Sequence, residues 1–288
     1  MNYSIAIQHR KSYRAFTDRK VPFELTEQIR RYYESSVKTL LPDLQTQLCL
    51  FADDVKAPLE GAAGYNQFLV GAPHYLVLLS ELHPLAAINA GYIMEDLLLN
   101  ITDLGLDTCW VTFTDSQLIK QSLGIESNLE VAAILAFGYG KKTTRRLRLN
   151  FKSMSNVDLV AKHRYMEPKR GIQELVYLNT WGDSHLLNER IGFFDDVLWE
   201  SFYAAALAPS YLNRQAYGFI VHDGGISLIR RPDEFTTAHD GDLSLGAALL
   251  HFSAVAENWA GPLRWYFGGD ASALKLPQGY SLVATCVL

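Results

Sequence analysis

The sequence predicts an α+β protein made of two pseudo-symmetric halves, each with a mainly antiparallel sheet flanked by helices and one long central helix. The first observation behind this prediction is that helical and strand-like patterns follow one another in the same order twice along the chain. The second is that matching residues recur at fixed offsets between the two parts. A repeat of only two units favours a pair packed like the subunits of a homodimer.

The first half contains a long helix that we expect to be buried. The stretch from Leu85 to Leu104 is apolar on most sides, and Gly105 ends it. An earlier helix begins at Pro22, and Asp115 caps a short later one. The predicted elements of this half are helix 22–36, strands 47–52 and 75–80, helix 85–104, strand 108–113, a short helix closed by Gly124, and strand 131–138.

The second half repeats this order after a mixed, polar stretch. Its predicted elements are helix 193–207, strands 217–222 and 226–231, helix 242–258, strand 264–267 and strand 282–288. We therefore divide the chain into a first half, 1–150, a connection that is a candidate lid, 151–190, and a second half, 191–288.

The offsets between the halves support an internal duplication. At an offset of 155 residues, the matched pairs are Gly91 with Gly246, Asp103 with Asn258 and Trp110 with Trp265. At an offset of 170 residues, they are Tyr33 with Tyr203, Gln45 with Gln215, Leu50 with Ile220 and Asp53 with Asp223.

The composition excludes several classes of protein. The 288 residues include 26 basic and 31 acidic side chains, so the net charge of −5 argues against a nucleic-acid partner. No apolar run is long enough for a membrane span or a signal peptide, so we expect a cytoplasmic protein with no membrane partner. The three cysteines form no CxxC pair and the eight histidines are scattered, so we expect buried thiols and no metal site.

Two basic segments are suited to a phosphate. Arg10–Arg14 (RKSYR) combines forked charged donors with a hydroxyl group just before a helix. Arg145–Arg148 (RRLR) follows the last strand of the first half and offers a second set of charges. A solvated basic terminus and a solvated tail would explain the same residues, and the spacing alone leaves these readings open.

Two further segments are suited to a planar heterocycle. Ala208–Gln215 (APSYLNRQ) follows a helix, and its amide side chains can read the edge of a ring. Gly105–Thr112 (GLDTCWVT) offers backbone N–H groups at an irregular strand end. Taken singly, the first segment also fits a turn with a capping serine, and the second fits an ordinary core strand.

In this order, the four segments resemble the FMN-dependent nitroreductase family, and in particular a single-chain, two-half branch of it. The family pattern combines an Arg-x-Ser-x-Arg segment, a Gly-Leu-x-Thr-x-Trp segment after the long helix, and an Ala-Pro-Ser-x-x-Asn-x-Gln turn. Ala72-Pro73 at a strand start and Gly138-Tyr139 before the basic run also match.

The resemblance implies a role for each matched residue. Those implied to bind the FMN phosphate and ribityl chain are Arg10, Lys11, Ser12 and Arg14, and those implied to close over the phosphate are Arg146 and Arg148. Backbone approach to the flavin ring is implied for Trp110, Val111 and Thr112. Contacts from the other half are implied for Pro209, Ser210, Asn213 and Gln215. Asn66 precedes the Ala-Pro strand, where some relatives place a flavin-contacting asparagine.

The two halves depart from the family pattern in complementary ways. Family members are usually homodimers with two sites at the subunit interface. At the offset of 170, Arg10–Arg14 falls on Thr180–Ser184, which has no arginine and contains Asp183, whose charge would repel a phosphate. The Pro-Ser-x-x-Asn turn falls on Thr39–Asp43, which lacks it. We therefore expect one FMN per chain and a protein that functions as a monomer, although further dimerisation is compatible with the sequence.

The implied activity is that of an FMN-dependent oxidoreductase. NAD(P)H would give a hydride to flavin N5 and leave before a nitroaromatic or quinone-type acceptor is reduced. The flavin carries the chemistry, so no catalytic side chain is expected, and no GxGxxG segment marks a dedicated dinucleotide fold. Two alternatives stay open: a flavin enzyme with other chemistry, such as reductive dehalogenation or dehydrogenation, and a non-catalytic flavin-binding protein.

Overall fold

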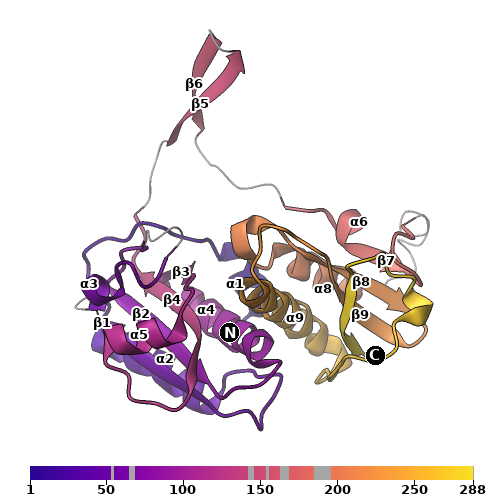
Figure 1. The fold of residues 1–288 in the computed structure, drawn as a ribbon, viewed down its shortest axis with the longest axis horizontal. Helices are drawn as coiled ribbons and strands as arrows, with labels where there is room; N and C mark the ends of the chain where they lie inside the picture. Colours follow the sequence, from indigo (N-terminus) through magenta and orange to yellow (C-terminus); the bar gives the residue numbers. More distant parts are fainter. Residues whose placement is uncertain are drawn as a thin grey trace.

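Two long helices, α4 (Ala86–Asp103) and α9 (Ala238–Ala260), lie side by side at the centre of the protein, with one sheet on either side of them (Figure 1). The structure is a computed structural model that describes residues 1–52, 55–64, 69–141, 146–153, 156–162, 169–184 and 196–287. In these ranges no helix is both long and apolar enough to cross a membrane.

The first half packs helices around a four-stranded antiparallel sheet of order β1-β2-β4-β3. Its other elements are α1 (Tyr3–His9), α2 (Phe23–Ser35), β1 (Thr46–Ala52), α3 (Lys56–Leu59), β2 (His74–Ser80), β3 (Asp107–Val111), α5 (Ser116–Leu123) and β4 (Glu130–Gly138).

The second half contains a five-stranded sheet of order β10-β11-β9-β8-β7. Its elements are α6 (Ile172–Leu175), β7 (Val176–Leu178), α8 (Asp196–Leu207), the 3-10 helix η2 (Tyr211–Asn213), β8 (Tyr217–His222), β9 (Gly225–Arg230), β10 (Trp265–Phe267), η3 (Ser272–Leu274) and β11 (Ser281–Cys286).

The two sheets share one strand order. Taken from β8, the second sheet runs β8-β9-β11-β10, which matches β1-β2-β4-β3 strand for strand, and β7 is an addition that pairs parallel with β8. The predicted α+β class with mainly antiparallel sheets and a long central helix in each half is therefore confirmed.

The crossing of the central helices explains the two glycines matched at 155 residues. A Cβ atom on Gly91 would lie 2.3 Å from the carbonyl oxygen of Leu243, and one on Gly246 would lie 2.0 Å from that of Ile88. Ile88 and Leu243 are themselves 155 residues apart, so the contact is reciprocal, as in an interface between two symmetric subunits. Only glycine lets the two helix backbones approach this closely.

A second reciprocal contact supports the offset of 170. The backbone N–H of Leu41 donates to Asn89 Oδ1 at 3.1 Å, and that of Tyr211 donates to Ser244 Oγ at 3.1 Å. Leu41 and Tyr211 are 170 residues apart, and the two acceptors on α4 and α9 are 155 apart. Equivalent turns in the two halves are thus tied to equivalent positions of the central helices.

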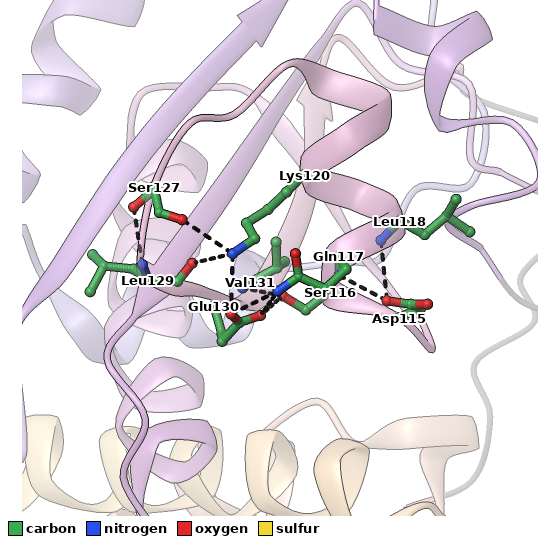
Figure 2. A network of polar contacts seen from close by, with 9 residues as sticks. All are labelled: Asp115, Ser116, Gln117, Leu118, Lys120, Ser127, Leu129, Glu130 and Val131. Atoms are coloured by element: carbon green, nitrogen blue, oxygen red, sulfur yellow. Dashed lines mark hydrogen bonds and ion pairs between the residues drawn. The ribbon is translucent and has the colours of Figure 1, made fainter.

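The ends of α5 follow the predicted local signals (Figure 2). Asp115 Oδ1 accepts from the backbone N–H groups of Gln117 and Leu118, and Gly124 ends the helix with a left-handed φ of 63°. Within the same network, Lys120 Nζ donates to Glu130 Oε1 at 3.1 Å and to two backbone carbonyls. The hydrogen bond from Ser116 and the Lys120 ammonium lower the pKa of Glu130 below its usual range.

Several observed elements were not predicted, among them α1 and three strands. Helix α1 packs Ala6 and Ile7 into the core directly before the basic segment. Strands β5 (Arg146–Ser153) and β6 (Asn156–Lys162) form a separate hairpin that projects from the body (Figure 1). Strand β7 lies within the predicted connection 151–190, yet it belongs to the second sheet. The boundaries of the halves and the connection stay predictions.

Candidate functional site

The basic N-terminal segment lies along the start of β3. Ser12 forms an isolated parallel bridge with Thr108, and the N–H of Tyr13 donates to the Thr108 carbonyl at 2.9 Å. Farther along, Phe16 pairs with Gly140 just after β4. The segment predicted to bind phosphate is therefore anchored against the strand predicted to approach the flavin ring.

Arg10 points inward, whereas its basic neighbours do not. The side chains of Lys11, Ser12 and Arg14 are exposed, while that of Arg10 is 10% exposed. Arg10 Nε lies 3.9 Å from Glu95 Oε1, and Nη1 donates to Ser12 Oγ at 3.4 Å. The buried Nε atom of Arg10 has no hydrogen-bond partner, so this guanidinium keeps donor capacity for a ligand.

The predicted flavin-facing residues at the end of β3 make contacts with different parts of the protein. Trp110 Nε1 donates to Glu95 Oε2 at 3.0 Å, which places its indole on the side of Arg10. Val111 is buried in the core of the first half, and the Thr112 carbonyl accepts from Gly64 N–H at 2.7 Å. Nothing in these contacts tests a backbone approach to a ring, so this role stays a prediction.

The predicted turn after α8 is held in an unusual backbone conformation. Ser210 Oγ accepts from the N–H of Gln215 at 3.0 Å, and the Ser210 carbonyl accepts from that of Asn213 at 2.9 Å. Pro209 is half-buried beside them. Leu212, Asn213 and Gln215 have φ of 48°, 57° and 47°, in the left-handed region. Such strain persists only where the surrounding structure fixes it, and it is concentrated at binding and active sites.

Gln215 is buried beneath this turn. Its Oε1 accepts from Arg170 N–H at 2.7 Å, and its Nε2 donates to the Ala206 carbonyl at 3.0 Å. In this structure the amide joins the turn to the segment that begins at Lys169. A direct contact between Gln215 and a cofactor stays a prediction.

The last carbonyls of α8 are capped by side chains from three separate parts of the chain. His251 Nδ1 lies 2.9 Å from the Ala204 carbonyl, Tyr217 donates to Ala205 at 2.9 Å, Gln215 to Ala206 at 3.0 Å, and Lys169 to Ala208 at 2.6 Å. These bonds satisfy carbonyls that have no partner within the helix. The positive charge of Lys169 also suits the negative end of the helix dipole.

Lys169 is a site residue that the sequence analysis missed. Burial and the like charge of Arg10 lower the pKa of Lys169 to about 8, while Glu95 opposes the shift. Lys169 thus lies within electrostatic reach of the first-half residues and is bonded to the second-half turn. Its signal was the Lys169-Arg170 pair within the predicted connection 151–190. The sequence alone gave no reason to place this pair near Arg10.

The buried groups around Arg10 leave an excess of positive charge. A carbonyl oxygen only accepts, so His251 Nδ1 carries a hydrogen where it meets Ala204. One further proton must lie between His251 Nε2 and Glu95 Oε1, which are 2.8 Å apart. The Glu95–His251 pair is therefore neutral overall, and Arg10 and protonated Lys169 remain without a full counter-charge. This arrangement fits a phosphate dianion.

An open hollow of about 440 Å³ lies beside this charge, within the size range of ligand pockets. It is lined by Lys169, Arg170, Glu174, Leu212, Asn213, Arg214 and Gln215. The hollow therefore combines the predicted turn with the basic pair that the sequence analysis left in the connection.

The structure does not bring all predicted residues together. Arg146 and Arg148 lie on β5, in the hairpin that projects from the body, away from α1 and α8 (Figure 1). Asn66 lies outside the described residues. Of the predicted set, Arg10, Ser12 and Trp110 lie together in the first half, and Ser210, Asn213 and Gln215 lie together in the turn. Lys169 connects the two groups, since it is within electrostatic reach of Arg10 and bonded to Ala208.

The segments that correspond to the site in the other pseudo-symmetric position make contacts within the protein. Lys38 Nζ pairs with Glu257 at 2.5 Å beside the turn at Thr39–Asp43. In the Thr180–Ser184 segment, the N–H of Trp181 donates to Leu274, and its ring packs between Tyr177 and Tyr280.

Comparison with known proteins identifies the family. A family model described as "Putative TM nitroreductase" matches residues 2–178, which is more than half of the chain. The chain belongs to this nitroreductase family. The family is one of oxidoreductases that act on small molecules. No curated protein matches the sequence.

Solved structures extend the likeness over the whole chain of this nitroreductase family member. A Thermotoga maritima protein described as a putative nitroreductase is 19% identical with a TM-score of 0.59, and the match covers 100% of this chain and 93% of that one. At this identity the match shows a shared fold. A nitroreductase family protein from Clostridium novyi (21% identity, TM-score 0.43) covers 49% of this chain and 87% of its own. An FMN-dependent nitroreductase from Clostridium difficile (18%, 0.41) covers 48% and 87%.

Proposed function

We propose that the chain is an FMN-dependent oxidoreductase with one composite cofactor site, which uses NAD(P)H to reduce a small electron acceptor of the nitroaromatic or quinone type. The observation that carries the proposal is the excess positive charge of Arg10 and Lys169, beside a strained turn that ends in Asn213 and Gln215. Arg10 comes from the first half, and the turn comes from the second.

The residues present fit the groups of FMN. Arg10, Ser12 and Lys169 would hold the phosphate, with Arg14 at the exposed rim. The polar hollow beside Asn213 would hold the remaining cofactor. In this arrangement Lys169 and Arg170 supply the second set of charges that the sequence analysis assigned to Arg146 and Arg148.

Bound FMN supplies hydride acceptance and donation at its ring, and the protein positions it. Arg10 and Lys169 neutralise the phosphate, which orders the cofactor in the hollow. The left-handed turn holds the Asn213 amide beside the same hollow. Because both halves come from one chain, no second subunit is needed to complete this site.

Four single variants test the composite site. Arg14→Ala and Asn213→Ala lie in different halves, and each should weaken FMN binding. Thr180→Ala and Asp43→Ala occupy the equivalent positions of the lost site and should leave the Kd unchanged. Loss of a charge-assisted contact costs about 1.5–3 kcal/mol, or roughly tenfold or more in affinity. Equal effects of all four variants in a fluorescence titration with FMN would contradict a single composite site.

A further inference from the structure

Glu95 is a fully buried acid on α4 to which two predicted cofactor-binding residues attach. Its Oε2 accepts from Trp110 Nε1 at 3.0 Å, and its Oε1 lies 3.9 Å from Arg10 Nε. The same Oε1 is 2.8 Å from Nε2 of His251, which is also fully buried. One carboxylate therefore contacts three side chains, two of them from the proposed site.

His251 extends this contact to the second half of the site. It lies on α9, and its Nδ1 donates to the carbonyl of Ala204 in the last turn of α8. Helix α8 leads directly into the turn that contains Ser210 and Asn213. A continuous chain of contacts thus joins Arg10 to α8, the helix that precedes the turn with Asn213.

Stability alone does not explain this pair. A buried acid and base must both leave water, and apolar side chains of similar size often stabilise a core equally well or better. The surrounding interior consists mainly of apolar side chains from α4, α8 and α9. A buried polar pair does, however, fix the orientation of the groups that it bonds.

We propose that Glu95 and His251 form a positioning pair for the composite site: Glu95 holds Arg10 and Trp110, and His251 fixes Glu95 to α8. The inference rests on the proposed function, and it adds two residues that do not themselves touch the cofactor. Replacement of the Glu95 carboxyl group should leave Arg10 free to turn away from the position that binds the phosphate.

The next residue of α4 provides a matched control. Asp96 is also fully buried, but it accepts hydrogen bonds from Tyr3 at 2.7 Å, Tyr32 at 3.0 Å and the Lys38 N–H at 2.8 Å. All of these partners belong to the first half and lie outside the proposed site. Asp96→Asn therefore removes a buried charge from the same helix without touching Arg10 or Trp110.

The test compares Glu95→Gln, His251→Gln and Asp96→Asn by thermal unfolding and by the Kd for FMN. We expect all three variants to unfold at a lower temperature. Only Glu95→Gln and His251→Gln should also raise the Kd, by about tenfold or more. In the cofactor-free protein, the indole N–H signal of Trp110, assigned with Trp110→Phe, should move in Glu95→Gln and stay in place in Asp96→Asn.

A double-variant cycle separates positioning from general destabilisation. Arg10→Met combined with Glu95→Gln should weaken FMN binding by less than the product of the two single effects, because Glu95 acts through Arg10. Arg10→Met combined with Asp96→Asn should give that product. The inference is overturned if the wild type binds FMN and Glu95→Gln binds it equally well, or if Asp96→Asn has the same effect. A wild type that binds no FMN overturns the proposed function itself, and this inference with it.

Discussion

The affinity for FMN should fall as the pH rises, because Lys169 must be protonated to attract the phosphate. Burial, together with the nearby Arg10, lowers the pKa of Lys169 to about 8 in the cofactor-free protein. An anion favours the charged form of the ammonium, so binding takes up a proton. The Kd should therefore rise when Lys169 loses its proton.

The size of the effect follows from the charged fraction of Lys169. With a pKa of about 8, this fraction falls from roughly 0.9 at about pH 7 to roughly 0.1 at about pH 9. The Kd for FMN should rise about tenfold over this range if Lys169 stays charged in the complex. The second pKa of the phosphate is about 6, so the phosphate is mainly a dianion over this pH range.

Fluorescence titrations of FMN at several pH values provide the assay, with two variants at the same position as controls. Lys169→Arg keeps its charge at every pH used, so its Kd should not rise. Lys169→Met should bind weakly and show no rise. A wild-type Kd that is constant over this range, or the same rise in Lys169→Arg, would refute the assignment of Lys169 to the phosphate.

Two further predictions concern stability. Gly91→Ala and Gly246→Ala should each lower the free energy of unfolding, measured by denaturant titration, by about 3 kcal/mol or more, because the new methyl group meets the backbone of the facing helix. The control is Gly241→Ala on α9. A Cβ atom at Gly241 would have its nearest neighbour at 3.5 Å, so this variant should be tolerated in the same titration. Lys120→Met should cost about 1–3 kcal/mol because it removes the side-chain donor to two backbone carbonyls and one of the donors to the Glu130 carboxylate. The exposed Lys20→Met is the control, and an equal loss in both lysine variants would contradict the role of this network.

The fold could be predicted where the signals are local. Asp115 and Gly124 delimit α5 because a cap and a left-handed glycine act within one turn of the chain. Helix α9 begins four residues before the predicted Asp242, since Thr237 Oγ1 accepts from the Asp240 N–H and starts the helix at Ala238. This Thr-x-x-Asp pattern could have been recognised in the sequence.

The hairpin and β7 could not be placed from local signals. Residues 146–162 alternate in polarity only partly and include Arg146 and Arg148, which we predicted to close over the phosphate. Strand β7 is three residues long, and it is defined by its parallel pairing with β8, a partner more than forty residues away. Short segments of this kind depend on tertiary contacts more than on their own sequence.

The candidate site, too, could be predicted only where its residues form a recognisable local pattern. The sequence indicated Arg10 and the turn near Asn213, because each segment carries its own recognisable residue pattern. Lys169, Glu95 and His251 were missed because their significance lies in contacts with distant elements. The available clues were the Lys169-Arg170 pair and the two acids, Glu95 and Asp96, inside a mostly apolar helix.

A single composite flavin site is tested most directly by the absorbance spectrum of the purified protein after FMN is added and excess cofactor is removed, with the bound flavin counted per chain. We expect one FMN per chain and loss of the flavin bands when NADH or NADPH is added without oxygen. Two FMN per chain would contradict the single composite site. No retained FMN would contradict the proposed function and leave the nitroreductase fold as the only shared property.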